Sequence, residues 1–300
     1  MPPGRSISEL VGSHGRSYLA HLRLPFNLLL APIYLWGVVL AGGTLQSWSF
    51  WLGFASLHVF LYGGTTAFNS YYDRDQGPIG GMVSPPRVGA GLLPFSLSVQ
   101  ALGVPFAAAV GTTFLVVWLL LFSLAFAYSH PRFRLKARAY PALLAVAFGQ
   151  GGLGFAAGWF VVDPRPASLL GVTPLVGIGA TALLLAGLYI VTQSYQTQED
   201  RRRGDLTLPV ILGARRALMV ALALLALGAV PLLLLLAVNS DWPTSILLAL
   251  LLLVVGIRLA HWANSFRENE VIANYQTAMR LVTVSSLALT AALIVKLWPA

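Results

Sequence analysis

The sequence predicts an all-α polytopic membrane protein, with nine transmembrane helices in one bundle, its N-terminus in the cytoplasm and its C-terminus outside. Three observations predict this fold class. Charged residues make up 10% of the 300-residue chain, against roughly 25% in soluble globular proteins. The residue types AVILMFWYC reach 57%, and the mean hydropathy is +0.76. The apolar residues also fall into separate stretches that are each long enough to cross a bilayer.

A spanning helix needs about 20 mostly apolar residues, because each adds about 1.5 Å against a hydrocarbon core of about 30 Å. The expected spans are residues 24–43, 50–70, 92–109, 111–128, 140–162, 172–195, 217–238, 245–262 and 279–298. The third and fourth divide one apolar run that Gly103, Pro105 or Gly111 can interrupt. We expect a single domain, residues 1–300. Residues 1–20 form a polar cytoplasmic segment without the apolar core of a signal peptide.

The charged residues predict the orientation of the bundle. With the N-terminus inside, all 19 lysines and arginines except Arg165 and Lys296 lie on inner segments, which satisfies the positive-inside rule. The net charge of +9 therefore reflects topology, and we expect no nucleic-acid partner. All ten acidic residues except Asp163 and Asp241 also lie inside, which places the expected chemistry on the cytoplasmic face. The absence of cysteine excludes disulfides, thiolate metal sites and a cysteine nucleophile.

Two predicted helices become polar at their cytoplasmic ends while the helical pattern continues. Asn69 and Asp73 are four residues apart and so share one helix face, and the same holds for Gln196 and Asp200. Magnesium is usually held by one or two carboxylates, with waters and substrate phosphates completing its shell. Two such ends facing each other can hold metal ions that a diphosphate bridges. The alternative is that both carboxylates only pair with neighbouring arginines at the headgroups.

A basic loop follows the fourth predicted span. Arg132, Arg134, Lys136 and Arg138 place four cations within seven residues, a pattern suited to clamping an anion such as a departing diphosphate. The alternative is ordinary positive-inside charge. Further candidate cations are Arg23, Arg87 and Arg201–Arg203.

These residues together resemble the UbiA superfamily of intramembrane prenyltransferases. That family carries Asn-x-x-x-Asp-x-x-x-Asp after its second helix, which reads here as Asn69, Asp73 and Gly77. It carries an Asp-x-x-x-Asp-type motif after its sixth helix, which reads here as Gln196 and Asp200. Gly204 and Thr207-Leu208 follow as in the family, Pro131 to Lys136 is similar to its basic loop, and residues 23–32 resemble its first-helix entry.

Two motif positions depart from the family. Gly77 replaces the last aspartate of the first motif, and Gln196 replaces the first aspartate of the second. Asp75 and Glu199 lie one or two positions away and are candidate substitutes for the missing aspartates, although one residue along a helix rotates a side chain by about 100°. The sequence leaves open weaker metal binding, one fewer metal ion, or a ligand set of the chain's own.

The resemblance implies a nine-helix enzyme that transfers a polyprenyl group, with Mg²⁺ as cofactor, from a prenyl diphosphate to a hydrophobic acceptor. An aromatic acceptor, in quinone or related lipid biosynthesis, is favoured because such members are common in the family. Asp73 and Asp200 are the expected principal ligands and catalytic residues, together with Lys136. The other expected metal ligands are Asn69, Gln196 and Glu199. The expected substrate-binding residues are Asn69, Gln196, Arg134, Arg138, Arg87, Arg23 and Tyr195.

Other functions remain open. A non-catalytic prenyl-lipid-binding or transport protein also suits paired polar helix ends. A CDP-alcohol phosphatidyltransferase requires an Asp-Gly-x-x-Ala-Arg run, which the sequence lacks. Minor candidates are Tyr71 and Tyr72 as cation-stabilising rings, His58 and His261 as membrane histidines, and Glu268 and Glu270 above the site. We expect an integral protein of a prokaryotic inner membrane, with the active site facing the cytoplasm.

Overall fold

The computed structural model describes residues 15–238 and 241–298. Regular structure in these ranges is helical, apart from two isolated β-bridges, Ile79–Met82 and Arg138–Leu206. Eight helices of the described ranges are long and apolar enough to cross a membrane. They are Gly15–Leu40, α6 (Leu92–Val110), α7 (Thr112–Ser129), Ala139–Phe160, α10 (Val172–Ser194), α13 (Ala214–Val238), α14 (Trp242–Ser265) and α15 (Val271–Leu297). Each coincides with one of the expected spans to within a few residues, except that the first span and α15 each begin well before the expected residue.

The segment expected as the second span is helical throughout but is not among those eight. It consists of α4 (Trp48–Ala55), the π-helical η2 (Ser56–Leu61) and α5 (Tyr62–Asp73). Serine, histidine, glycine and threonine residues make this segment less apolar than the others. The structure therefore shows eight apolar spans and one more polar helix beside them, and the count of nine crossings stays a prediction.

The first span is interrupted near its beginning. Residues 15–21 are helical, and Arg23 then adopts left-handed backbone angles, with φ 45°. The chain continues through α2 (Leu24–Asn27), η1 (Leu28–Leu30) and α3 (Ala31–Leu40). The part of the predicted polar segment before residue 15 lies outside the described residues. This interruption buries the Arg23 side chain within the bundle, where it is 9% exposed.

The long apolar run between residues 92 and 128 divides at Gly111. Its φ of 146° is a conformation that L-residues rarely adopt, so glycine at this position permits the sharp turn between α6 and α7. Pro105 lies inside α6 and does not end it.

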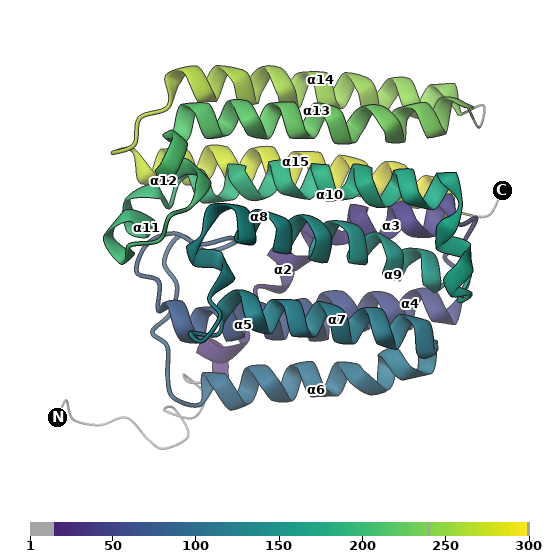
Figure 1. Ribbon diagram of the computed structural model, residues 1–300, viewed down its shortest axis with the longest axis horizontal. Helices are drawn as coiled ribbons and strands as arrows, with labels where there is room; N and C mark the ends of the chain where they lie inside the picture. Colours follow the sequence, from purple (N-terminus) through teal and green to yellow (C-terminus); the bar gives the residue numbers. More distant parts are fainter. Residues whose placement is uncertain (1–14, 239–240, 299–300) are drawn as a thin grey trace.

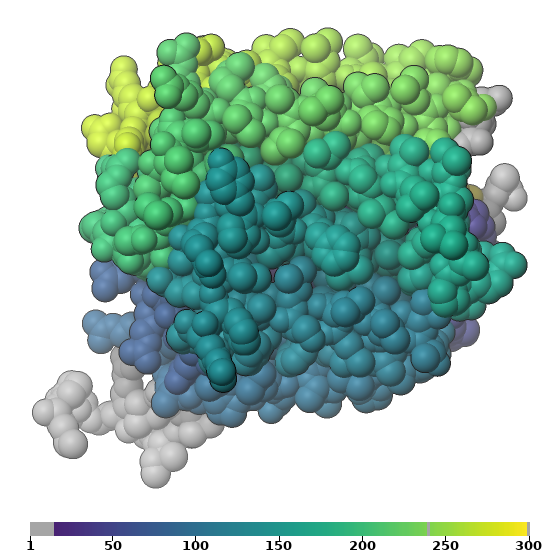
Figure 2. All heavy atoms as spheres, in the orientation of Figure 1, coloured from purple at the N-terminus to yellow at the C-terminus, as the bar shows by residue number. Residues whose placement is uncertain are grey.

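The spans run alongside one another, with α13 and α14 at one side of the bundle and α6 at the other (Figures 1 and 2). α10 packs mainly against α13, and α3 against α9 (Gly154–Phe160). The α3–α9 crossing depends on small residues, because a Cβ atom at Gly37 or Gly158 would overlap backbone atoms of the opposite helix. Without a water-driven hydrophobic effect, such close contact is a main source of helix association in a bilayer.

The short elements that carry the polar motifs gather at one end of the bundle (left in Figure 1). This end holds the end of α5, the loop of residues 74–91, η3 (Leu135–Ala137), α11 (Thr197–Arg203) and α12 (Leu208–Leu212). At the opposite end, two ion pairs join Asp163 to Arg165 and Asp241 to Lys296. These four are the charges that the topology prediction assigned to the outer side, so the structure separates the two groups of charges as expected. Which end faces the cytoplasm stays a prediction.

Candidate active site

A polar cavity lies at the motif-bearing end and collects four carboxylates from two distant parts of the chain. Asp73 is the last residue of α5 and Asp75 follows it, and Asp200 and Asp205 come from α11 and the residue after its capping glycine. The complete lining is Arg23, Asn69, Asp73, Asp75, Ile79, Gly80, Tyr128, Lys136, Tyr189, Thr192, Gln193, Gln196, Asp200, Arg203, Asp205 and Thr207. The two acidic motifs therefore face one space.

Lys136 connects the basic loop to the first motif. The left-handed conformation of Arg134, with φ 40°, precedes the turn of η3 from which Lys136 projects. Its Nζ donates hydrogen bonds to Asn69 Oδ1 at 2.9 Å and to the Asp73 carboxylate. The Asn69 oxygen also accepts a hydrogen bond from Ser129 Oγ at 2.7 Å. Burial lowers the pKa of Lys136, and the neighbouring Asp73 partly offsets this effect.

The other three carboxylates have different partners. Arg203 Nη1 lies 2.8 Å from Asp75, and Arg134 Nη1 lies 3.0 Å from Asp205. Asp200 accepts a hydrogen bond from the Thr207 hydroxyl at 3.0 Å, and no lysine or arginine in the described ranges forms an ion pair with it. Burial raises the pKa of Asp200 to about 7. A cation bound beside this carboxylate would favour its charged form.

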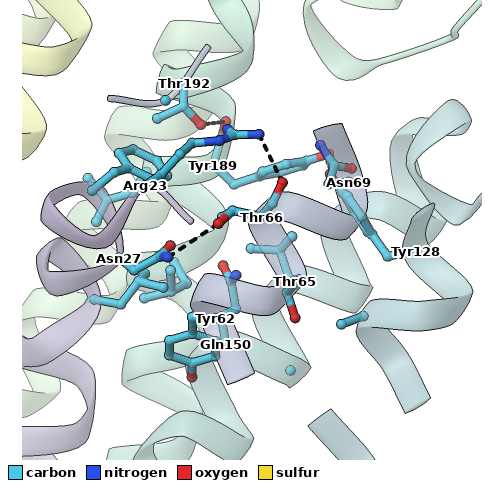
Figure 3. Close-up of a pocket in the computed structure, with 18 of the residues that line it drawn as sticks. Arg23, Asn27, Tyr62, Thr65, Thr66, Asn69, Tyr128, Gln150, Tyr189 and Thr192 are labelled. Atoms are coloured by element: carbon cyan, nitrogen blue, oxygen red, sulfur yellow. Dashed lines mark hydrogen bonds between the residues drawn. The ribbon is translucent and has the colours of Figure 1, made fainter. Parts of the chain in front are cut away.

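An apolar chamber adjoins the polar cavity and extends into the bundle. Its aliphatic lining includes Leu29, Leu30, Leu61, Leu121, Leu124, Ala145, Val146, Leu185 and Leu188. Residues that line both spaces are Arg23, Asn69, Gly80, Tyr128, Tyr189, Thr192 and Gln196, so the two spaces lie directly next to each other. Figure 3 shows Arg23, Asn69, Tyr128, Tyr189 and Thr192 around this boundary. The arrangement offers a charged end and a long apolar end to one ligand.

Two tyrosines at the boundary were missed by the sequence analysis. The hydroxyl oxygens of Tyr128 and Tyr189 lie 2.8 Å apart, and Gln193 Nε2 donates to the Tyr189 hydroxyl at 2.6 Å. Tyr128 is near the end of α7 and Tyr189 is in the last turns of α10. Aromatic residues at matching depth in the fourth and sixth spans are the signal that could have pointed to them.

The sequence-predicted site residues separate into two groups. Those that line the polar cavity are Asp73, Asp200, Lys136, Asn69, Gln196, Arg23 and Arg203. Tyr195 lines the apolar chamber and stacks edge-on against Tyr275, with ring centroids 5.2 Å apart. The cavity also includes Asp75, a candidate substitute for the missing aspartate, and Asp205 and Thr207, which were not among the predicted site residues.

The remaining candidates lie elsewhere. Arg87 is exposed, and Arg138 donates to the carbonyl of Phe133. Arg134 reaches the site only through its ion pair with Asp205. Glu199 faces a neighbouring surface pocket that it shares with Asp73 and Gly77. Neither Tyr71 nor Tyr72 lines the cavity or the chamber, nor do His58, His261, Glu268 and Glu270.

The helical pattern that we expected to continue through the second motif is interrupted. α10 ends at Ser194, and Gln196 precedes the first residue of α11. Gln196 and Asp200 nevertheless remain one turn apart, because Asp200 N donates to Gln196 O at 2.9 Å. The break turns α11 across the end of the bundle and brings Asp200 over the same cavity as Asp73.

The oxygen atoms around the cavity fit a hard divalent cation. Asp73, Asp75 and Asp200 offer carboxylate oxygens, and Asn69 and Gln196 offer amide oxygens. Such oxygens suit Mg²⁺, which often takes one or two carboxylates and completes its shell with waters and substrate phosphates. Within the described parts of the chain, no three His, Cys, Asp or Glu residues form a metal-holding group by themselves. Waters, amide oxygens or the phosphate oxygens of a substrate would complete the shell of a metal ion here.

A helical bundle of membrane-spanning length, with a carboxylate-lined cavity beside an apolar chamber, is the arrangement of an intramembrane protein. The chain belongs to the UbiA prenyltransferase family, whose model matches residues 30–284. It is therefore an integral multi-pass membrane protein, as the apolar helices also indicate. No curated protein sequence matches the chain.

Solved structures share this fold. A UbiA homolog from Archaeoglobus fulgidus bound to DMAPP and Mg²⁺ has a TM-score of 0.68 and 20% identity, covering 94% of this chain and 99% of that one. The same homolog bound to GPP and Mg²⁺ has a TM-score of 0.63 and 20% identity, covering 92% and 99%. The apo structure of a UbiA homolog from Aeropyrum pernix K1 has a TM-score of 0.69 and 20% identity, covering 91% and 98%.

Proposed function

We propose that the protein is a Mg²⁺-dependent prenyltransferase, which transfers a polyprenyl group from a prenyl diphosphate to a hydrophobic acceptor and releases diphosphate. One observation carries this proposal. Asp73, Asp200 and Lys136 meet in a polar cavity that adjoins an apolar chamber, an arrangement that suits a diphosphate head and an isoprenoid tail. The A. fulgidus homolog bound to GPP or DMAPP with Mg²⁺ supports the same substrate class.

The acidic and basic residues of the cavity have different proposed roles. Asp73 and Asp200 would hold the metal ion, with Asn69 and Gln196 as amide partners, and the bound ion would neutralise the diphosphate head. Lys136 contributes a fixed positive charge beside Asp73 and stabilises the diphosphate as the carbon–oxygen bond breaks. Arg23 is a second buried cation, and its Nε has no hydrogen-bond partner, so it can donate to a phosphate oxygen.

The chamber walls protect the allylic carbon from water. When the bond to diphosphate breaks, this carbon becomes cationic or nearly so, and water would capture it before the acceptor does. Tyr128 and Tyr189 stand where the head region meets the tail region and offer aromatic surface at this position. We favour an aromatic acceptor in quinone or related lipid biosynthesis, because such acceptors are common in the family. The proposal also places the protein, as one domain, in a prokaryotic inner membrane with its active site facing the cytoplasm.

A non-catalytic prenyl-lipid-binding or transport protein is the alternative. It would bind the same substrate head but would not break the carbon–oxygen bond. The position of Lys136 next to Asp73 and Asn69 favours the enzyme, because a buried cation beside the metal-binding carboxylate is suited to a departing diphosphate.

The test measures binding and turnover separately in nanodiscs. A labelled long-chain prenyl diphosphate is titrated with and without Mg²⁺, and diphosphate release is then followed with a panel of aromatic acceptors. We expect Mg²⁺-dependent binding and acceptor-dependent release in the wild type, and loss of both in Asp73→Asn and Asp200→Asn. Asp163→Asn, at the opposite end of the bundle, is the matched control and should retain both.

Binding without diphosphate release for any acceptor would favour the lipid-binding alternative. Absence of binding under every condition would overturn the prenyl diphosphate assignment.

A further inference from the structure

Arg203 joins the two acidic motifs directly. Its Nη1 lies 2.8 Å from Asp75, which follows α5, and its Nη2 lies 2.5 Å from Glu199 in α11. The Asp75 side chain is 5% exposed and that of Arg203 is 22% exposed, so this fork of ion pairs is largely shielded from solvent. An arginine carries its positive charge permanently. The cavity therefore contains a built-in cation between the two motifs.

The two motif positions that lack a carboxylate are Gly77 and Gln196. The contacts at both positions help to hold this arrangement. A Cβ atom at Gly77 would lie 2.8 Å from Glu199 Oε2, so a side chain at position 77 would displace that carboxylate. Gln196 Nε2 donates to Pro78 O at 3.2 Å, and Gln76 N donates to Glu199 Oε1 at 3.3 Å. These hydrogen bonds connect the loop after α5 to the start of α11 without a metal ion.

Few carboxylates of the cavity are left to bind a second metal ion. Asp75 is paired with Arg203, and Asp205 is paired with Arg134. Asp73, which contacts Lys136 through Oδ1, and Asp200, which forms no ion pair with the lysines and arginines of the described ranges, bring one carboxylate from each motif to the same cavity. A divalent ion that used Asp75 would have to break its ion pair and would then lie close to the guanidinium charge of Arg203.

Building on the proposed prenyltransferase function, we propose that this site takes a single Mg²⁺ with its diphosphate, and that Arg203 supplies the positive charge that a second ion would otherwise provide. Asp73 and Asp200 hold the ion together with oxygens of the diphosphate. Arg203 is a positioning residue, because it fixes Asp75 and Glu199 and its charge faces the diphosphate across the cavity. Gly77 and Gln196 are part of the same arrangement.

Counting metal ions tests this proposal without turnover. Protein in nanodiscs is saturated with unreactive geranyl S-thiolodiphosphate and titrated with Mn²⁺, and the free ion is measured by electron paramagnetic resonance. We expect one bound Mn²⁺ per protein chain. Two bound ions in the wild type would overturn the inference and leave the proposed function intact. Absence of thiolodiphosphate binding would instead contradict the proposed function, on which the inference rests.

Three variants separate the charge of Arg203 from a purely structural role. Arg203→Gln frees Asp75 and Glu199, and we expect a second Mn²⁺ to bind. Arg203→Lys keeps the charge and should retain one ion. Arg201→Gln changes a more exposed neighbour that pairs with Glu268, and it should also retain one. A folded Arg203→Gln protein that still binds one ion would contradict the role given to Arg203. If this variant does not fold, the number of Mn²⁺ ions bound by the wild type still decides the proposal.

Discussion

Tyr128 and Tyr189 join two transmembrane helices hydroxyl to hydroxyl, with their oxygens 2.8 Å apart at the boundary of the polar cavity and the apolar chamber. The pair closes the wall next to the position proposed for the bond that breaks. Both residues are partly buried, and the Tyr189 hydroxyl also accepts a hydrogen bond from Gln193 Nε2. The pair therefore connects the packing of α7 and α10 to the chemistry of the site.

The first prediction concerns this pair. Tyr189→Phe removes one hydroxyl and should slow turnover by less than about tenfold, since a hydrogen bond contributes about 0.5–1.5 kcal/mol net. Tyr189→Ala also removes the ring, so water reaches the cation and more substrate ends as prenyl alcohol. Chromatography of the products measures the share of alcohol. Tyr140→Phe, at an exposed position, is the control. An unchanged product ratio in Tyr189→Ala would show that this ring does not exclude water.

The second prediction concerns Lys136. Lys136→Met leaves Asp73 without its cation and removes a charge that stabilises the departing diphosphate, so turnover should fall by about 10²-fold or more. Diphosphate release under single-turnover conditions measures the effect. Lys296→Met removes an ion-paired lysine at the opposite end and should leave the rate nearly unchanged. Near-wild-type turnover in Lys136→Met would exclude this residue from catalysis.

The third prediction concerns the room for the isoprenoid tail. Ala145 lines the chamber, so Ala145→Phe fills space that the tail would occupy. We expect a larger loss of affinity for geranylgeranyl diphosphate than for geranyl diphosphate, because the shorter chain needs less of the chamber. Competitive binding of the two in nanodiscs gives the ratio. Leu144→Phe makes a similar change on the exposed face of the same helix and should leave the ratio unaltered. Equal losses for both chains would place the tail elsewhere.

The fourth prediction concerns the crossing of α3 and α9. Gly158→Ala forces a methyl group against the backbone oxygen of Tyr34, which requires the helices to move apart. Overpacking of this kind costs about 1–3 kcal/mol or more, so the thermal unfolding midpoint should fall clearly. Gly179→Ala, whose Cβ would meet no atom within 4 Å, is the matched control. A Gly158→Ala protein as stable as this control would show that the crossing can relax without cost.

Several features could be predicted because they depend on consecutive residues. Hydropathy located the eight apolar spans, and the four-residue spacing placed Asn69 and Asp73 on one helical turn, where Lys136 contacts both. Glycine at position 111 was one of three candidate breaks, and its positive φ explains why it, and not Pro105, ends the helix.

The residues of the cavity were only partly predictable. Among the described residues, the non-glycine positions with positive φ are Arg23, Arg74 and Arg134. Arginine has no special preference for this conformation, so the sequence gives no sign of these turns. Arg23 and Arg134 each lie where the chain changes direction beside the cavity. These turns influence which neighbouring cations face inward, including Lys136.

The sequence by itself determined a multi-span helical membrane protein with two polar motifs and a basic loop, because apolar length and helical spacing are local properties of the chain. The tertiary structure decided which members of these motifs share a cavity. Arg23, Asp75 and Arg203 line it, while Arg87 and Arg138 do not. The physical reason is that the cavity forms where the ends of separate helices meet. The direction of each side chain there depends on helix breaks and packing that no single segment encodes.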